Sequence, residues 1–209
     1  MENLPYIIVQ VVILFFSLSV HESAHAWMAD KLGDPTGRRL NRITLNPIRH
    51  IDLFGTLIIP AFLIIVRSPF VFGWAKPVPV NPFNFKDPYK GIALTSLSGP
   101  ASNFLISIIS FILFKIFLLF SSPGTYSEPI AIILISMIVI NLLLGFFNLI
   151  PLPPLDGAGV LSGFFPDSAG KFMDKIQPFS LILLVLILST GIFSKFFGIL
   201  IGFVLKWLQ

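Results

Sequence analysis

Long apolar runs separated by short polar segments dominate the chain. The runs lie near residues 5–29, 91–120, 129–150 and 178–207. Each approaches or exceeds the roughly 20 residues that a helix needs to cross the hydrocarbon core of a bilayer. The pattern predicts a membrane α-helical protein, a polytopic transmembrane helix bundle. The last run is too long for one perpendicular crossing and too short for two.

A further apolar run, residues 51–66, is short and is interrupted by Gly55 and Pro60. We expect it to be re-entrant or to lie in the membrane interface. On either side of it, residues 40–46 alternate polar and apolar positions, and residues 76–81 carry two alternate prolines. The prolines remove donors from one edge only, so the other edge is able to pair with an extended substrate. We therefore predict short membrane-associated β-strands between the first and second core helices.

The composition agrees with a membrane protein and excludes several other classes. Of the 209 residues, 55% are hydrophobic, the mean hydropathy is +0.91 and none is cysteine. Disulfides and thiolate metal ligands are therefore excluded. The basic residues gather mostly in one connecting region, so we interpret them as a topology signal and expect no nucleic-acid binding. We expect a single domain, 1–209, with a core at about 5–165 and a C-terminal transmembrane segment at about 178–207.

A cleaved signal peptide is the alternative interpretation of the first run, because Ala24-His25-Ala26 resembles a cleavage site. However, the segment before the run contains no Lys or Arg, and the run is long for the apolar part of a signal peptide. We therefore interpret the first run as a transmembrane helix.

That run ends in the motif His21-Glu22-x-x-His25. In a helix, residues four apart lie about 40° apart around the axis and roughly 6 Å along it, so both imidazoles can reach one metal ion. Glu22 is then free to act on water at that metal. Residues 3–20 carry no charge, and the first ionised residue after the motif is Asp30. The metal would therefore lie below the membrane surface.

Catalytic zinc usually has three protein ligands and an open position, so a third ligand must come from elsewhere in the chain. The candidates are His50, Asp52, Asp87, Glu128, Asp156, Asp167 and Asp174. Asp156 stands out because a proline-rich stretch places it at the end of a transmembrane helix. A turn or N-cap role is equally compatible with it, since Asp-Gly is a common turn pair. We interpret His50, next to Arg49, as an interfacial residue.

Three segments of the chain together resemble one protein family. They are His21-Glu22-x-x-His25, Ser98-Gly99-Pro100-x-x-Asn103 and Asn148-x-x-Pro151-x-Pro153-Pro154-Leu155-Asp156-Gly157. In this order they resemble the site-2 protease family of intramembrane zinc metalloproteases, over about residues 5–165. The resemblance implies an enzyme that hydrolyses peptide bonds in or near transmembrane segments of membrane proteins. The chain is similar to a compact member without the PDZ or CBS domains of some relatives.

The resemblance also implies roles for the matching residues. Glu22 would be the general base, and one Zn²⁺ per chain would be bound by His21, His25 and Asp156. Asn148 or Asn103 would hold the oxyanion or the substrate backbone, with helix packing as the alternative role for these amides. The expected partners are a transmembrane protein or peptide substrate and the lipid bilayer.

A shared metal also predicts the topology of the chain. The helix before Asp156 must run in the same direction as the first helix, so the run at 91–120 runs opposite. Residues 30–90 then begin and end on one side, and they hold nine Lys or Arg against four Asp. The positive-inside rule places that side of the cell membrane, and the opening of the active site, in the cytoplasm.

Two other functions are alternatives to proteolysis. One is an ion or metal transporter that uses buried His, Glu and Asp as an ion relay, but a relay needs neither the exact spacing of the motif nor an aspartate delivered by prolines. An inactive scaffold of the same fold is disfavoured because Glu22 is intact.

Overall fold

The computed structural model describes residues 4–66, 73–120 and 127–208. In this part of the chain, four helices are long and apolar enough to cross a membrane: Leu4–Lys31, Pro88–Phe120, Glu128–Asn148 and Pro166–Ser189. The predicted polytopic helical bundle is therefore confirmed. The fourth helix differs from the prediction, because it begins before residue 178 and ends at Ser189.

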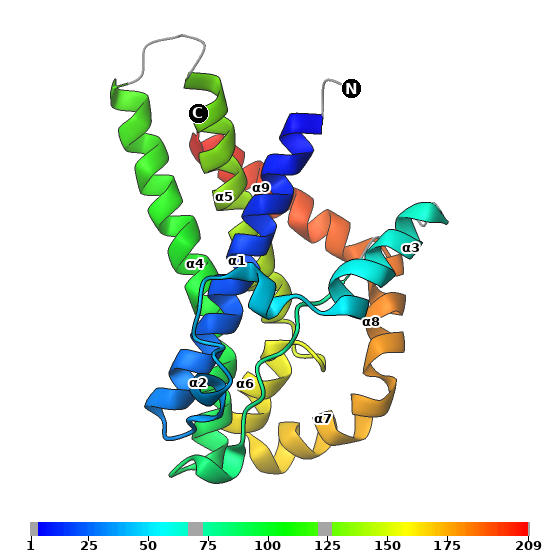
Figure 1. The fold of residues 1–209 in the computed structure, drawn as a ribbon. Coiled ribbons are helices and arrows are strands. Elements are labelled where there is room, and N and C mark those ends of the chain that lie inside the picture. The colour runs from blue at the N-terminus through cyan, green and yellow to red at the C-terminus, as the bar shows by residue number, and fades with distance from the viewer. Residues whose placement is uncertain (1–3, 67–72, 121–126, 209) are drawn as a thin grey trace.

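Three of these helices pack together to form the centre of the molecule. They are α1 (Leu4–Lys31), α4 (Pro88–Phe120) and α5 (Ser127–Asn148). Figure 1 shows α1 and α5 running down from the top of the molecule, whereas α4 runs up from the bottom to the top. This is the parallel arrangement of the first helix and the helix before Asp156 that a shared metal requires.

Small residues let these helices approach each other closely. The buried side of α1 carries serines and alanines on either side of its two histidines, and the buried side of α4 includes Ser98, Gly99 and Pro100. Side chains of this size allow helix backbones to come near one another in a bilayer, where packing and hydrogen bonds replace the hydrophobic effect as the driving force. The histidines of α1 are consequently held against the backbone of α4.

The remaining elements form the connections and the C-terminal part. Between α1 and α4 lie α2 (Thr36–Arg39), a 3₁₀ turn (Pro47–His50), a π-helical turn (Leu53–Ile58), α3 (Ile59–Ile65) and a 3₁₀ turn (Pro82–Asn84). After α5 come α6 (Asp156–Phe164), a π-helical turn (Pro166–Gly170), α7 (Lys171–Ile176), a 3₁₀ turn (Gln177–Phe179), α8 (Ser180–Ser189) and α9 (Ile192–Leu208). The run predicted at 178–207 is thus divided between α8 and α9, where Gly191 adopts a φ of 72°.

The predicted β-strands at 40–46 and 76–81 are wrong, because the described residues contain no strand. At 40–46 the chain turns, since Asn41 has a φ of 53° and the Asn46 side chain caps the following 3₁₀ turn. Residues 76–81 are extended, but their N–H groups donate to partners other than a strand. The Lys76 N–H donates to the His50 carbonyl (2.8 Å), and the Asn81 N–H donates to Asp34 Oδ2 (2.7 Å).

Within the apolar run 51–66, the π-helical turn Leu53–Ile58 continues into α3 as one short helical segment. Its π-helical turn and α3 together are too short to be counted among the four candidate spans. The Asp52 side chain caps this helix by accepting from the N–H groups of Phe54 (3.1 Å) and Gly55 (2.7 Å). The re-entrant or interfacial position of this segment remains a prediction.

The Asp34 side chain, just after α1, accepts hydrogen bonds from Asn81 and Asn84 in the segment before α4. The side chain is fully buried, and it accepts hydrogen bonds from the Thr36 N–H (3.1 Å), the Asn81 N–H (2.7 Å) and Asn84 Nδ2 (2.7 Å). Burial alone would raise the pKa of Asp34, but these hydrogen bonds and that of the Thr36 hydroxyl outweigh it and lower the pKa below its ordinary value. The extended segment 76–81 is consequently held along α1, beside the histidine motif.

Candidate metal centre

Two helices far apart in the sequence bring one aspartate and two histidines together. His21 and His25 lie one turn apart on α1, and Asp156 is the first residue of α6. His21 Nε2 lies 3.0 Å from Asp156 Oδ2, His25 Nε2 lies 3.2 Å from Asp156 Oδ1, and the two Nε2 atoms are 3.1 Å apart. Both histidines are buried. In the described residues this is the one group of three or more such side chains with the spacing of a metal site.

Hydrogen bonds behind the His21 ring determine which of its nitrogens carries the proton. The Met137 carbonyl can only accept, so Asn141 Nδ2 donates to it (2.9 Å) and Asn141 Oδ1 accepts from Asn103 Nδ2 (2.9 Å). Asn103 Oδ1 therefore faces His21 Nδ1 at 2.6 Å, and this nitrogen must be the donor. His21 Nε2 is left with a lone pair that points to the site.

The second histidine is oriented by the backbone of α4. His25 Nδ1 lies 2.7 Å from the Thr95 carbonyl oxygen, which can only accept. The Nδ1–H therefore donates, and His25 Nε2 also presents a lone pair to the site. A second hydrogen bond that fixes the tautomer and the ring orientation is the usual environment of a metal-binding histidine.

These assignments show that the three side chains fit a cation. With both imidazoles neutral, two nitrogen lone pairs and a carboxylate converge at 3.0–3.2 Å, and Asp156 Oδ2 is a buried atom without a hydrogen-bond partner. Such an arrangement is repulsive unless a positive ion lies among the atoms. Ligands about 2.0–2.1 Å from a tetrahedral zinc lie roughly 3.3 Å apart, close to the separations in this site.

Two glycines permit the close approach of the three elements. A side chain at Gly99 of α4 would begin 2.5 Å from the ring of His25 and 2.6 Å from the ring of His21. A side chain at Gly157 would begin 2.2 Å from the carbonyl oxygen of Leu149. The glycines of the Ser-Gly-Pro and Asp-Gly segments therefore leave room for the imidazoles and for the turn that carries Asp156.

Glu22 lies beside the histidines and is held by the extended segment. It is partly exposed, and its Oε2 atom accepts a hydrogen bond from the Val78 N–H (3.2 Å). Pro77 and Pro79 have no N–H, so Val78 is the one residue of this tripeptide whose backbone can donate a hydrogen bond. The edge of 76–81 that we expected to pair with substrate thus directs this N–H to the glutamate.

The other sequence candidates lie in different environments. Asn103 is fully buried behind His21, and Asn148 Nδ2 donates to the Leu144 carbonyl (3.0 Å) of its own helix. His50 is buried, with its Nε2 2.9 Å from the Thr44 carbonyl oxygen in the connecting region. Asp156 is not an N-cap, because Leu155 holds that position and α6 has no side-chain cap.

Sequence reasoning missed Asn141 and Thr95, and it assigned the Val78 N–H to substrate pairing, whereas in the structure this group donates to Glu22. Asn141 is a lone amide in the apolar run Ile138-Val139-Ile140-Asn141-Leu142, and a polar group at such a depth is a signal of function that could have been used. Thr95 acts through its backbone carbonyl, so the identity of its side chain gives no signal.

A bundle of helices long and apolar enough to cross a membrane, around two buried histidines and a partly buried aspartate, is the arrangement of a membrane-embedded metalloenzyme. The family model described as Peptidase family M50 matches residues 121–190. Putative zinc metalloprotease YwhC of Bacillus subtilis is 35% identical over 193 residues, which cover 91% of this chain and 83% of that protein. The chain belongs to peptidase family M50.

Two further relatives are more distant. Putative zinc metalloprotease Rip2 of Mycolicibacterium smegmatis is 23% identical over 181 residues, 87% of this chain and 66% of that protein. Zinc metalloprotease MJ0392 of Methanocaldococcus jannaschii is 25% identical over 170 residues, 81% of this chain and 38% of that protein. No solved structure gives a significant match.

Membership of this family confirms several predictions made from the sequence. The chain is an intramembrane zinc metalloprotease and a multi-pass membrane protein, and the predicted site-2 protease relationship and the Zn²⁺ cofactor are both confirmed. A transporter or an inactive scaffold is not favoured.

Proposed function

We propose that His21, His25 and Asp156 bind one catalytic Zn²⁺ and that Glu22 is the general base of peptide-bond hydrolysis. The observation that carries the proposal is the convergence of two Nε2 lone pairs and the Asp156 carboxylate at separations of 3.0–3.2 Å. When bound, Zn²⁺ supplies a Lewis acid that polarises a carbonyl and acidifies water. Three protein ligands leave the fourth position of a tetrahedral site open for chemistry.

In this proposal Glu22 moves the proton. Its carboxylate takes a proton from the attacking water and returns it to the nitrogen of the leaving amine, as a general base and then a general acid. The Val78 N–H holds one carboxylate oxygen, Oε2, at 3.2 Å and leaves the other free to face the water. Because the side chain is partly exposed, water and substrate can reach it.

The two asparagines differ in what the structure offers them. Asn103 uses its carbonyl oxygen on His21 and its amide nitrogen on Asn141, so we propose that it orients the metal ligand. Among the described residues, Asn148 donates to the Leu144 carbonyl of its own helix, and we retain it as a candidate for binding the substrate backbone or the oxyanion.

We also propose that the site opens to the cytoplasm and that residues 1–209 act as one domain. The basic residues of the connecting region support this orientation by the positive-inside rule. Single cysteines at Arg39 and Lys86, both exposed, should react with a membrane-impermeant reagent from the cytoplasmic side only. The natural chain has no cysteine, so the background is clean. Reaction from opposite sides would contradict the topology.

Zinc content tests the ligand assignment directly. His21→Ala, His25→Ala and Asp156→Ala should each lower zinc well below one per chain in purified protein. Asp174→Ala, a carboxylate outside the site, is the matched control and should retain zinc. Full zinc in Asp156→Ala would refute its assignment as the third ligand.

A further inference from the structure

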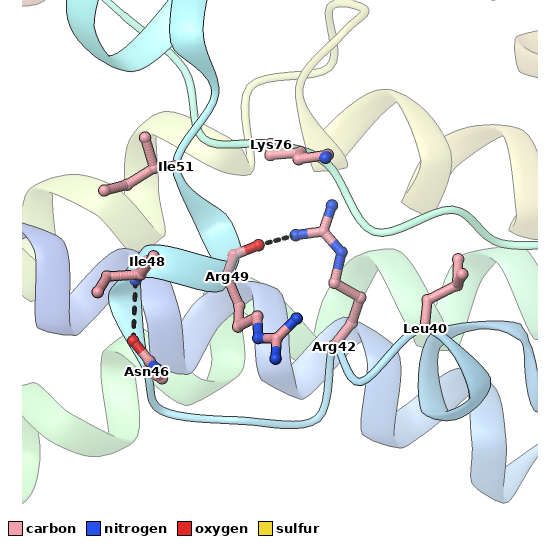
Figure 2. A pocket seen from close by; sticks show the side chains of 7 residues that line it. All are labelled: Leu40, Arg42, Asn46, Ile48, Arg49, Ile51 and Lys76. Atoms are coloured by element: carbon pink, nitrogen blue, oxygen red, sulfur yellow. Dashed lines mark hydrogen bonds between the residues drawn. The ribbon is translucent and has the colours of Figure 1, made fainter.

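A cavity of about 470 Å³ lies in the connecting region, on the opposite side of segment 76–81 from Glu22. Figure 2 shows the side chains that line it: Leu40, Arg42, Asn46, Ile48, Arg49, Ile51 and Lys76. Three of these are cationic and none is acidic. We call this cavity the basic pocket.

Arg42 is the most unusual residue of the basic pocket. It is 6% exposed, and its guanidinium donates to the Arg49 carbonyl and, over 3.4 Å, to the Pro77 carbonyl. Carbonyl oxygens satisfy hydrogen bonds but do not neutralise a charge, and a buried cation without a counter-ion is costly. In the described part of the chain, no carboxylate forms an ion pair with Arg42, Arg49 or Lys76. The pocket therefore presents unbalanced positive charge.

The lining also has an apolar side. Ile48 is 72% exposed and Leu40 is 52% exposed, and both border the same cavity as the cations. A free inorganic anion would gain nothing from these side chains. A phospholipid places its phosphate next to its acyl chains. Basic pockets on the cytoplasmic side of membrane proteins bind such headgroups, and the topology proposed above puts the connecting region on that side.

From this combination we propose that the basic pocket binds the phosphate of an anionic phospholipid. Arg42, Arg49 and Lys76 contact the phosphate, while Leu40 and Ile48 contact the beginning of the acyl chains. An adjacent cavity of about 550 Å³ shares Arg49 but is less suited, because its own Arg38 is paired with Asp30 at 3.2 Å.

The lipid site is connected to the catalytic residue by one peptide unit. The Pro77 carbonyl accepts from Arg42, and the N–H of the same peptide bond, on Val78, donates to Glu22. An anion that holds Arg42 in place therefore also holds the group that orients Glu22. A bound lipid of this class would keep segment 76–81 in position beside the active site.

Lipid retention measured by native mass spectrometry tests the site without reference to activity. The full chain in neutral detergent is offered phosphatidylglycerol, phosphatidylcholine or inorganic phosphate. We expect one phosphatidylglycerol per chain, bound at least tenfold more tightly than phosphatidylcholine. The double variant Arg49→Gln, Lys76→Gln changes exposed side chains only and should weaken retention by roughly 25-fold, about fivefold per charge.

Arg39→Gln is the matched control, since Arg39 is exposed and basic but lines neither cavity. It should change retention less than twofold, and all variants should keep their zinc. Equal retention of the two lipids, equal weakening by Arg39→Gln, or inorganic phosphate binding as tightly as phosphatidylglycerol would each overturn the proposal. One further outcome would overturn it: the double variant retains lipid normally but no longer cleaves substrates with acidic flanking residues. The pocket would then bind the substrate and not a lipid.

Discussion

Replacing Asn141 with leucine should weaken zinc binding, although Asn141 does not touch the metal site. The change removes the acceptor 2.9 Å from Asn103 Nδ2 and leaves that amide only the Ser17 carbonyl at 3.5 Å. Asn103 is then free to turn its nitrogen toward His21 Nδ1, which favours the tautomer with a proton on Nε2. That tautomer cannot bind a metal through Nε2.

The expected size of this effect separates it from ordinary loss of packing. Losing the partner of a metal-binding histidine typically costs 10- to 100-fold in metal affinity, about 1.4–2.7 kcal/mol. The helix-packing contribution of one such hydrogen bond in a membrane averages only about 0.6 kcal/mol. We therefore expect zinc affinity to fall by more than the stability of the bundle.

Competition with a chromophoric chelator measures the affinity, and Ser107→Ala is the matched control. Ser107 on α4 also donates to α5, to the Ile138 carbonyl (3.0 Å), but has no link to a histidine. The control should bind zinc as tightly as the natural chain. The reasoning is refuted if Asn141→Leu retains natural affinity, or if Ser107→Ala loses as much as Asn141→Leu does.

Three further predictions test the elements around the site. Gly99→Ala should lower zinc content, because the added carbon would lie 2.5 Å from an imidazole, whereas Gly198→Ala, with nothing within 4 Å, should not. Val78→Pro removes the N–H that donates to Glu22 and should lower kcat by roughly 10- to 100-fold with zinc unchanged, since a hydrogen bond to a charged group contributes about 1.5–3 kcal/mol. The control Val78→Ala keeps the N–H and should turn over substrate at the natural rate. The pKa of Asp34 is lowered in the folded state, so its stabilisation is fully present above the ordinary value of 3.8 and is lost as the pH falls through the lowered pKa. Denaturant titrations should thus show the natural chain more stable than Asp34→Asn near neutral pH, with the difference vanishing in acid, and a difference independent of pH would contradict this.

The helical core and the two histidines of the proposed zinc site were predictable because their signals are local, whereas the role of Asp156 came from the family resemblance, since its spacing alone left a turn equally possible. Run length gives the crossing helices, and the i, i+4 spacing gives the two imidazoles at once. Alternation wrongly predicted β-strands at 40–46 and 76–81, because hydrogen bonds to residues far away in the sequence decide the conformation of these segments. The N–H of Val78 is taken by Glu22 and that of Asn81 by Asp34, both on or next to α1.

The most direct test of the account compares zinc and cleavage in Glu22→Gln. The variant is purified in parallel with the natural chain, reconstituted in lipid vesicles with a transmembrane substrate, and analysed for both metal content and peptide products. Glutamine keeps the size of the side chain but cannot take the proton from water. We expect zinc to stay near one per chain while cleavage falls to background. Cleavage at the natural rate, or loss of zinc together with activity, would contradict the assignment of Glu22 as a base that is not a metal ligand.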